Sequence, residues 1–301
     1  MKDICINPED DVQSVLDSAE PGMRIRLRGG EYRCKIEINV PGVELIGEGA
    51  DKTVIVCGDY ANKLDETGRE YVTFRTYTVA VCAGGVKICD LCIKNDAGSP
   101  ETKGQEVALT VYGDGFSAEN CRLESTQDTL FCGPLPPDLI ERYDGFLADK
   151  LRKGDYLRQI FRSCEIIGTV DFIFGCGDAL FDGCKIVSAP DARGTGYVAA
   201  PAHAQCQNVG FVFYGCDFDR VRGVAENSVY LARPWRDYGK ASFINCRYGE
   251  HIAGCGFDKW NDTRRDRTAR FAEYGADRSK RVPWSRSLSG EEKEYLLGYF
   301  K

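Results

Sequence analysis

Short hydrophobic stretches recur along the whole chain and alternate with polar positions. Each stretch is only a few residues long and is bounded by Gly, Asn or Asp. A period of two with such boundaries predicts short β-strands joined by tight turns. The clearest copies place a phenylalanine three residues before a cysteine: FRSCEI (161–166), FDGCKI (181–186), FYGCDF (213–218) and FINCRY (243–248).

These copies follow one another at intervals of about 20–30 residues, the length of one coil in a solenoid. Because no helical pattern lies between most of them, each strand set is expected to stack on the next as a rung. The repeat therefore predicts an all-β fold, a single-domain right-handed parallel β-helix over residues 1–301, with phenylalanines and cysteines as inward ladders. A β-sandwich is the competing fold, but it would not repeat the same inward residues.

Two segments depart from the strand pattern. Asp11 to Ser18 is predicted to be a short helix that caps the N-terminal end of the solenoid. The segment 133–158 opens with GPLPPD and then shows helical spacing, which predicts a turn and a helix that ends near Gly154. Its helically spaced apolar residues are Leu139, Ile140, Tyr143, Phe146, Leu147 and Leu151.

Composition narrows the possible partners and location. With 39 basic and 46 acidic side chains the net charge is −7, which argues against a nucleic-acid partner. No apolar run approaches the ~18 residues of a membrane span. The 15 cysteines and two histidines favour a reduced protein without a metal site or cofactor. The opening MKDICINPEDD has no apolar h-region, so we expect that it is not a secretory signal. We expect a cytoplasmic protein, or alternatively a secreted one whose signal has been removed.

Polar residues inside strand-like apolar runs are the candidates for chemistry. Gln105 opens QEVALTVY, Gln127 and Asp128 lie in STQDTLF, Asp171 lies in GTVDFIFG, and Arg233 lies in YLARPW. Once the 133–158 excursion is subtracted, Asp128 and Asp171 are about one coil apart, as are Gln105 and Gln127. We therefore expect two carboxylates, two amides and a guanidinium to gather on one face.

The motifs that carry these residues are similar to those of the pectin methylesterases (pectinesterases), a family of carbohydrate esterases built on a parallel β-helix. The similarity covers nearly the whole chain, and the combination of QDTL, DFIFG and RPW is highly specific. The resemblance implies a carboxylic ester hydrolase acting on methylated homogalacturonan or its oligomers. The matching motifs are GEYRC (30–34), QEVAL (105–109), QDTL (127–130), DFIFG (171–175), GYVAAP (196–201), LARPW (231–235) and FDKW (257–260).

The resemblance also implies a role for each residue. Asp171 would be the nucleophile and Asp128 the general acid and base. Gln105 and Gln127 would form the oxyanion hole. Arg233 would keep Asp171 ionised. The pKa of Asp128 would be raised by the neighbouring charge of Asp171. Trp235 would form a sugar-stacking wall, and further substrate-binding residues would be Phe131, Val170, Phe174, Tyr197, Ala200 and Trp260.

Other readings stay open. A pectate lyase or polygalacturonase could use carboxylates on the same fold, and a non-catalytic carbohydrate-binding β-helix is a third possibility. The base of the 133–158 excursion lies beside the expected cleft, so we expect it to wall one end of the groove and to favour short oligogalacturonides. A surface hairpin or a dimer contact is the alternative, and the sequence leaves the oligomeric state undetermined.

Overall fold

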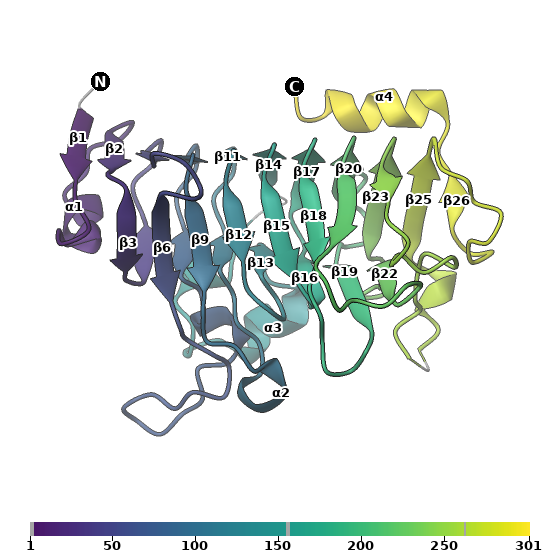
Figure 1. Ribbon diagram of the computed structural model, residues 1–301, viewed down its shortest axis with the longest axis horizontal. Helices are drawn as coiled ribbons and strands as arrows, with labels where there is room; N and C mark the ends of the chain where they lie inside the picture. Colours follow the sequence, from purple (N-terminus) through teal and green to yellow (C-terminus); the bar gives the residue numbers. More distant parts are fainter. Residues whose placement is uncertain (1–2, 155–156, 262) are drawn as a thin grey trace.

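The computed structural model describes residues 3–154, 157–261 and 263–301, and its strands form a stack of coils along one axis (Figure 1). Among these residues, all strand pairs between successive coils are parallel, and the strands form three sheets of 11, 8 and 7 strands. The predicted parallel β-helix is therefore confirmed. Each sheet takes about one strand from every coil, so a residue on one coil lies beside its counterpart on the next.

The 11-stranded sheet runs the full length of the stack. It contains β1 (Asp3–Ile6), β2 (Arg24–Leu27), β5 (Glu44–Ile46), β8 (Lys87–Cys89), β11 (Phe116–Glu119), β14 (Arg158–Arg162), β17 (Asp178–Asp182), β20 (Phe211–Tyr214), β23 (Lys240–Ile244), β25 (Arg270–Tyr274) and β26 (Arg286–Ser287).

The other two sheets complete each coil. The eight-stranded sheet contains β3 (Gly30–Arg33), β6 (Thr53–Cys57), β9 (Cys92–Asn95), β12 (Arg122–Glu124), β15 (Glu165–Gly168), β18 (Lys185–Ser188), β21 (Asp217–Arg220) and β24 (Arg247–Tyr248). The seven-stranded sheet contains β4 (Ile36–Ile38), β7 (Val79–Val81), β10 (Leu109–Val111), β13 (Leu130–Cys132), β16 (Val170–Gly175), β19 (Gly196–Pro201) and β22 (Val229–Ala232).

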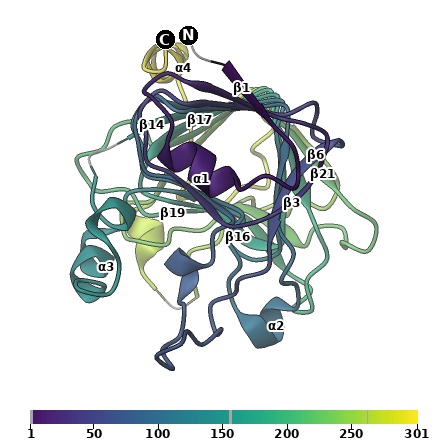
Figure 2. The same ribbon diagram turned by 90° about the vertical axis from the view of Figure 1, so that its left-hand side faces the viewer.

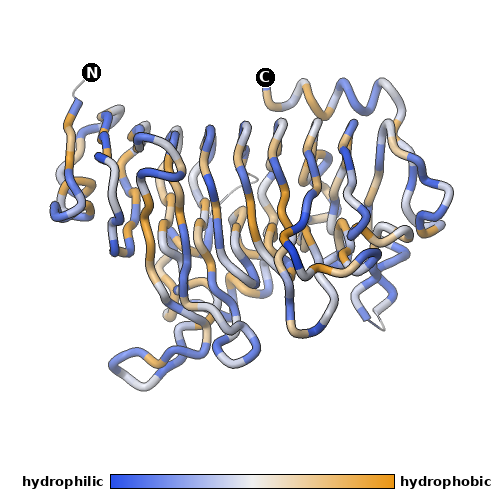
Figure 3. The backbone as a smooth tube through the Cα atoms, viewed as in Figure 1, coloured by the Kyte–Doolittle hydropathy of each residue, from blue (hydrophilic) through white to orange (hydrophobic). Residues whose placement is uncertain are grey.

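The predicted phenylalanine ladder lies on the inner face of the 11-stranded sheet, in the core of the solenoid. Phe161, Phe181, Phe213 and Phe243 are fully buried and occupy matching register positions on β14, β17, β20 and β23. Their rings stack with centroids 4.6–5.1 Å apart and interplanar angles of 3–13°. Hydrophobic and polar residues follow one another along the strands (Figure 3), as expected where successive side chains point to opposite faces of a sheet.

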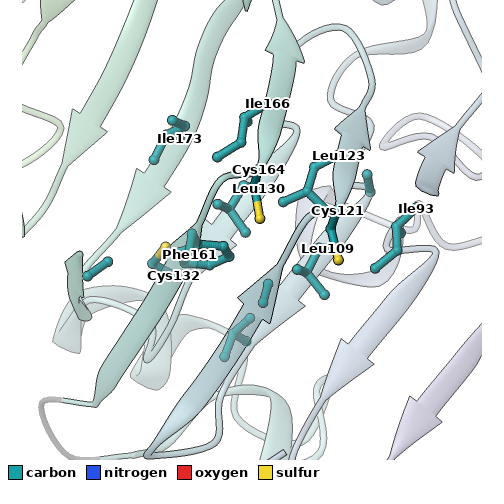
Figure 4. Packing of buried hydrophobic residues seen from close by; sticks show 14 of the residues in the cluster. Ile93, Leu109, Cys121, Leu123, Leu130, Cys132, Phe161, Cys164, Ile166 and Ile173 are labelled. Carbon is teal, nitrogen blue, oxygen red and sulfur yellow. The ribbon is translucent and has the colours of Figure 1, made fainter. Parts of the chain in front are cut away.

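The cysteines form a second ladder beside the phenylalanines. Figure 4 shows Cys121 and Cys164 on successive coils among buried aliphatic side chains and Phe161. The Cys216 thiol lies 3.1 Å from the Phe181 carbonyl oxygen of the preceding coil, and the Cys184 thiol lies 3.3 Å from that of Phe161. The thiols of Cys184 and Cys216 thus fill core space and donate weak hydrogen bonds to carbonyls of the preceding coil.

Two helices cover surfaces that the stack would otherwise expose. α1 (Val12–Asp17) lies across the N-terminal opening of the solenoid (Figure 2) and buries Val12 and Leu16, as the sequence predicted. Asp11 caps it by accepting a hydrogen bond from the Ser14 amide. α4 (Gly290–Gly298) packs Leu296 into an apolar cluster on the outer face of the 11-stranded sheet. None of the described helices is long and apolar enough to cross a membrane.

The predicted excursion leaves the coil after β13, but its helix is shorter than the apolar spacing suggested. α3 covers only Pro137–Arg142, and a 3₁₀ turn follows at Asp149–Leu151. The helix ends because the chain then turns through Gly145, whose φ of +71° is easily reached only by glycine. Positions 155 and 156 of the predicted excursion lie outside the described residues. The remaining short helix, α2 (Pro100–Lys103), follows β9.

Candidate active site

All five predicted polar residues meet on the outer face of the seven-stranded sheet, in a cleft of about 310 Å³. Asp128 lies two residues before β13, Asp171 lies within β16, and Arg233 directly follows β22. Since these strands are ordered β22-β19-β16-β13-β10, residues far apart in the sequence are brought to one place. The cleft is lined by Thr73, Phe74, Gln105, Gln127, Asp128, Leu139, Arg142, Tyr143, Asp171, Phe174, Ala200, Arg233, Trp235, Arg236 and Trp260.

Both carboxylates sit on strained backbone. Asp128 and Asp171 have φ angles of +69° and +52°, a region that side chains other than glycine adopt rarely. At Asp171 the pairing of β16 with β19 shifts register between Val170 and Ile173, so the strand bulges there. Such irregularities redirect a side chain out of the regular alternation, and they concentrate at functional sites.

Arg233 fixes the carboxylate of Asp171. Its Nε and Nη2 atoms donate hydrogen bonds of 2.8 and 2.6 Å to the two oxygens of Asp171. The guanidinium is itself held between two aromatic rings, 3.8 Å from the centroid of Tyr197 and 4.0 Å from that of Trp260. A bidentate, charge-assisted pair of this kind sets both the charge and the orientation of the carboxylate.

The two carboxyl groups differ in how their charge is compensated. Burial raises the pKa of Asp128 well above its usual range, and the nearby charge of Asp171 raises it further. Burial also raises the pKa of Asp171, but the hydrogen bonds and charge of Arg233 oppose that rise. The pKa of Asp171 is therefore raised less than that of Asp128. This is the order that the sequence analysis predicted, with the higher pKa at Asp128. The larger cause of the rise at Asp128, however, is burial and not the charge of Asp171.

Gln127 is oriented by an arginine that sequence reasoning did not select. Arg193 donates from Nη2 to the Gln127 side-chain oxygen over 3.1 Å, and it is held by two hydrogen bonds to Asp191 of 2.6 and 2.8 Å. With its oxygen engaged in this way, the amide of Gln127 keeps its NH₂ group available as a donor. Asp191 and Arg193 lie in a loop without periodicity, and only their position directly before the GYVAAP motif could have indicated them.

The comparisons with known proteins agree with this geometry. The pectinesterase family model matches residues 6–134 and 149–296. The chain belongs to the pectinesterase family. Pectinesterase QRT1 of Arabidopsis thaliana is 31% identical over an alignment of 302 positions, which covers 95% of this chain and 71% of that protein. The chain spans only 46% and 44% of two other relatives, both named as probable pectinesterase/pectinesterase inhibitors.

Solved structures of pectinesterases share the fold. Pectin methylesterase from Yersinia enterocolitica superposes with a TM-score of 0.80 at 28% identity, covering 97% of each chain. A pectin methylesterase solved in complex with a hexasaccharide gives a TM-score of 0.78 at 25% identity, covering 95% of this chain and 91% of that one. Membership of the pectinesterase family places this chain among the carboxylic ester hydrolases.

The structure separates the predicted substrate-binding residues of this pectinesterase into two groups. Trp235, Phe174, Ala200 and Trp260 line the cleft, and Trp235 packs edge-on against Phe174 at 5.7 Å. The other three do not line it. Tyr197 stacks on Tyr230 and supports Arg233. Val170 and Phe131 are buried.

Phe131 is buried because the excursion after β13 covers it. It belongs to an apolar cluster on the outer face of the seven-stranded sheet, together with Leu139, Leu147 and Leu151 of the excursion. Its ring lies 4.9 Å from that of Phe174, which does reach the cleft. Phe131 is therefore part of the floor that supports Phe174. Among the described residues no group of three His, Cys, Asp or Glu could hold a metal ion.

Proposed function

We propose that this chain hydrolyses the C6 methyl esters of methylated homogalacturonan or its oligomers, releasing methanol and a free galacturonate carboxylate, with Asp171 as the nucleophile. The observation that carries this proposal is the bidentate Arg233–Asp171 pair beside the buried Asp128 in one cleft. It supplies an ionised carboxylate and a protonated one, which are the two forms that an acyl-transfer reaction of this kind needs.

In the first half of the reaction the Asp171 carboxylate attacks the ester carbonyl carbon. The carbonyl oxygen becomes an oxyanion, which the amides of Gln105 and Gln127 stabilise from the wall of the cleft. The bond to the methoxy group then breaks while protonated Asp128 donates its proton to the leaving oxygen. Methanol departs, and an anhydride joins Asp171 to the substrate.

In the second half, ionised Asp128 takes a proton from a water molecule, which attacks the substrate carbonyl of the anhydride. The bond between the substrate carbonyl and Asp171 breaks, which regenerates Asp171 as a carboxylate held by Arg233 and leaves Asp128 protonated again. The product leaves as galacturonic acid and loses its proton to bulk water. The raised pKa of Asp128 suits it to both steps, because a group that is neutral before the reaction must give up and recover one proton per turnover.

Asp171→Asn tests the nucleophile. We expect methanol release from methylated oligogalacturonides to fall by about 10⁴-fold or more, since no covalent intermediate can form. Loss of one charge from the buried pair with Arg233 should also lower the melting temperature, so the assay is run well below it. Methanol release at the wild-type rate would refute the assignment. The same assay on the wild-type protein separates the alternative functions. Unsaturated products or new reducing ends in place of methanol would indicate a lyase or a polygalacturonase. Oligomer binding without any product would indicate a carbohydrate-binding protein.

The excursion after β13 supports a preference for short substrates. Its residues Leu139, Arg142 and Tyr143 line the cleft and so occupy one of its walls. We expect kcat/KM for methanol release to be highest on short methylated oligogalacturonides and lower on polymeric pectin of the same degree of methylation. A defined series of increasing length, compared at equal ester concentration, measures this. A kcat/KM that rises steadily to the polymer would refute the preference.

A further inference from the structure

The segment 135–148 distinguishes this chain from the family pattern. The family model matches the residues on both sides of it and leaves the segment itself unmatched. Within it, α3 lies beside the coils of the seven-stranded sheet, on the outside of the solenoid (Figure 2). This segment contributes three residues to the lining of the cleft, Leu139, Arg142 and Tyr143, so its side chains can contact a bound substrate.

The segment is firmly attached to the solenoid. Asp138, in the first turn of α3, accepts hydrogen bonds of 3.0 and 2.6 Å from Arg236, which follows the RPW motif. The buried Arg152 donates over 2.6 Å to the carbonyl of Ile140 and over 2.6 Å to Asp144. Tyr143 packs edge-on against Phe74 at 5.7 Å. The segment is thus tied to the solenoid through Asp138 and Tyr143 and braced internally by Arg152, and such a wall can position a side chain for recognition.

Arg142 differs from the other arginines around the cleft. Arg233 is paired with Asp171, Arg236 with Asp138, and Arg193 with Asp191. Within the described part of the chain, Arg142 has no salt bridge, although its side chain lines the cleft. The charge of Arg142 acts on Asp138 one helical turn earlier, but it forms no ion pair with it. A guanidinium that makes no salt bridge in a cleft is suited to an anionic ligand group, and its planar fork matches a carboxylate.

We propose that Arg142 binds the free carboxylate of a galacturonate unit in the same oligomer as the methyl ester that is cleaved. The inference rests on the proposed function for the substrate class. A methyl-esterified unit carries no charge and cannot form an ion pair with Arg142, whereas a de-esterified unit can. The preferred substrate is therefore a partly de-esterified oligogalacturonide, and fully methylated ones are bound less well.

The test uses the full chain and three variants: Arg142→Gln, Arg142→Lys, and Arg247→Gln as the matched control. Arg247 is an exposed arginine on β24, in the eight-stranded sheet, and it pairs with Asp217. Two quantities are measured. The first is the Kd of fully de-esterified hexagalacturonate, by calorimetry. The second is the ratio of kcat/KM for methanol release from a hexamer with a single methyl ester to that from a fully methylated hexamer.

We expect Arg142→Gln to weaken hexagalacturonate binding by about five- to ten-fold at low salt, as the loss of one charge-assisted contact implies. The kcat/KM ratio should fall by a similar factor. Arg142→Lys should restore part of both, because the charge remains but the fork geometry does not. Arg247→Gln should match the wild type, and the difference between the Gln variant and the wild type should shrink at 0.5 M salt.

The two proposals fail in different ways. An unchanged hexagalacturonate Kd and kcat/KM ratio in Arg142→Gln, with methanol release intact, would overturn the carboxylate site alone. Hexagalacturonate binding that depends on Arg142, in a protein that releases no methanol, would refute the proposed function and leave the carboxylate site standing. An equal loss of binding in Arg247→Gln would show a general charge effect and would also overturn the site.

Discussion

The phenylalanine ladder and the cleft are built on the same coils but follow opposite rules. In the ladder, Phe181 and Phe213 repeat one residue type at one register position, with rings stacked at 4.6 Å. In the cleft, neighbouring coils contribute different residues, such as Asp128 and Asp171, and both sit at positive φ. Repetition from coil to coil thus indicates the scaffold, and departures from it, in residue type and in backbone, indicate chemistry.

The two regions also differ in how buried polar groups are satisfied. The Cys216 thiol of the cysteine ladder meets a backbone carbonyl of the preceding coil, so it is buried at little cost. Asp128 is buried beside a second carboxylate, and its pKa is raised as a result. The cleft therefore contains groups that reduce stability at neutral pH and are useful only because they react.

Asp128→Asn breaks this contrast most strongly. We expect methanol release to fall by about 10³-fold, because asparagine can neither donate nor recover the proton. Stability should change in the opposite direction. The folded-state pKa of Asp128 lies above its unfolded value of about 3.9, so folding favours the protonated form, and stability is lost as the pH rises through the folded pKa.

The asparagine variant lacks this penalty. Its melting temperature at pH 7 should exceed that of the wild type, and the difference should vanish below about pH 4, where Asp128 is protonated in both states. Thermal unfolding from pH 3 to pH 8 measures this. A melting temperature that is lower at pH 7 than that of the wild type would show that ionised Asp128 stabilises the fold. Asp171→Asn is the comparison variant for this stability effect. It removes a charge that Arg233 compensates, so it should lower the melting temperature at pH 7.

The sequence could predict what depends on the repeat. The Phe–Cys copies gave the coils, and the coil length placed Asp128 and Asp171 on neighbouring strands, which β13 and β16 confirm. The N-terminal helix followed from the need to shield the end of the solenoid, and α1 confirms it.

What escaped prediction depends on contacts outside the repeat. Arg193 reaches Gln127 from a loop, and loop paths carry no periodic signal. The helix in the excursion stops before Gly145 because a backbone turn overrides the apolar spacing. Phe131 was expected in the cleft, but the excursion that covers it packs through tertiary contacts that spacing alone does not reveal.

Phe213→Leu tests the phenylalanine ladder and has the smallest expected effect of these variants. The Phe213 ring is fully buried and stacks between Phe181 and Phe243, with centroid distances of 4.6 and 4.8 Å. Replacing it should cost about 1–2 kcal/mol, from the lost stacking and imperfect filling of the core, and should lower the melting temperature by a few degrees. Phe300→Leu, at the edge of the apolar cluster that includes α4, is the matched control and should cost less.

Since Phe213 faces the core and not the cleft, kcat/KM for methanol release should stay within about two-fold of wild type at 25 °C. A ten-fold loss there, in a protein that remains folded, would show that the ladder sets the geometry of the cleft and that the two regions are not independent.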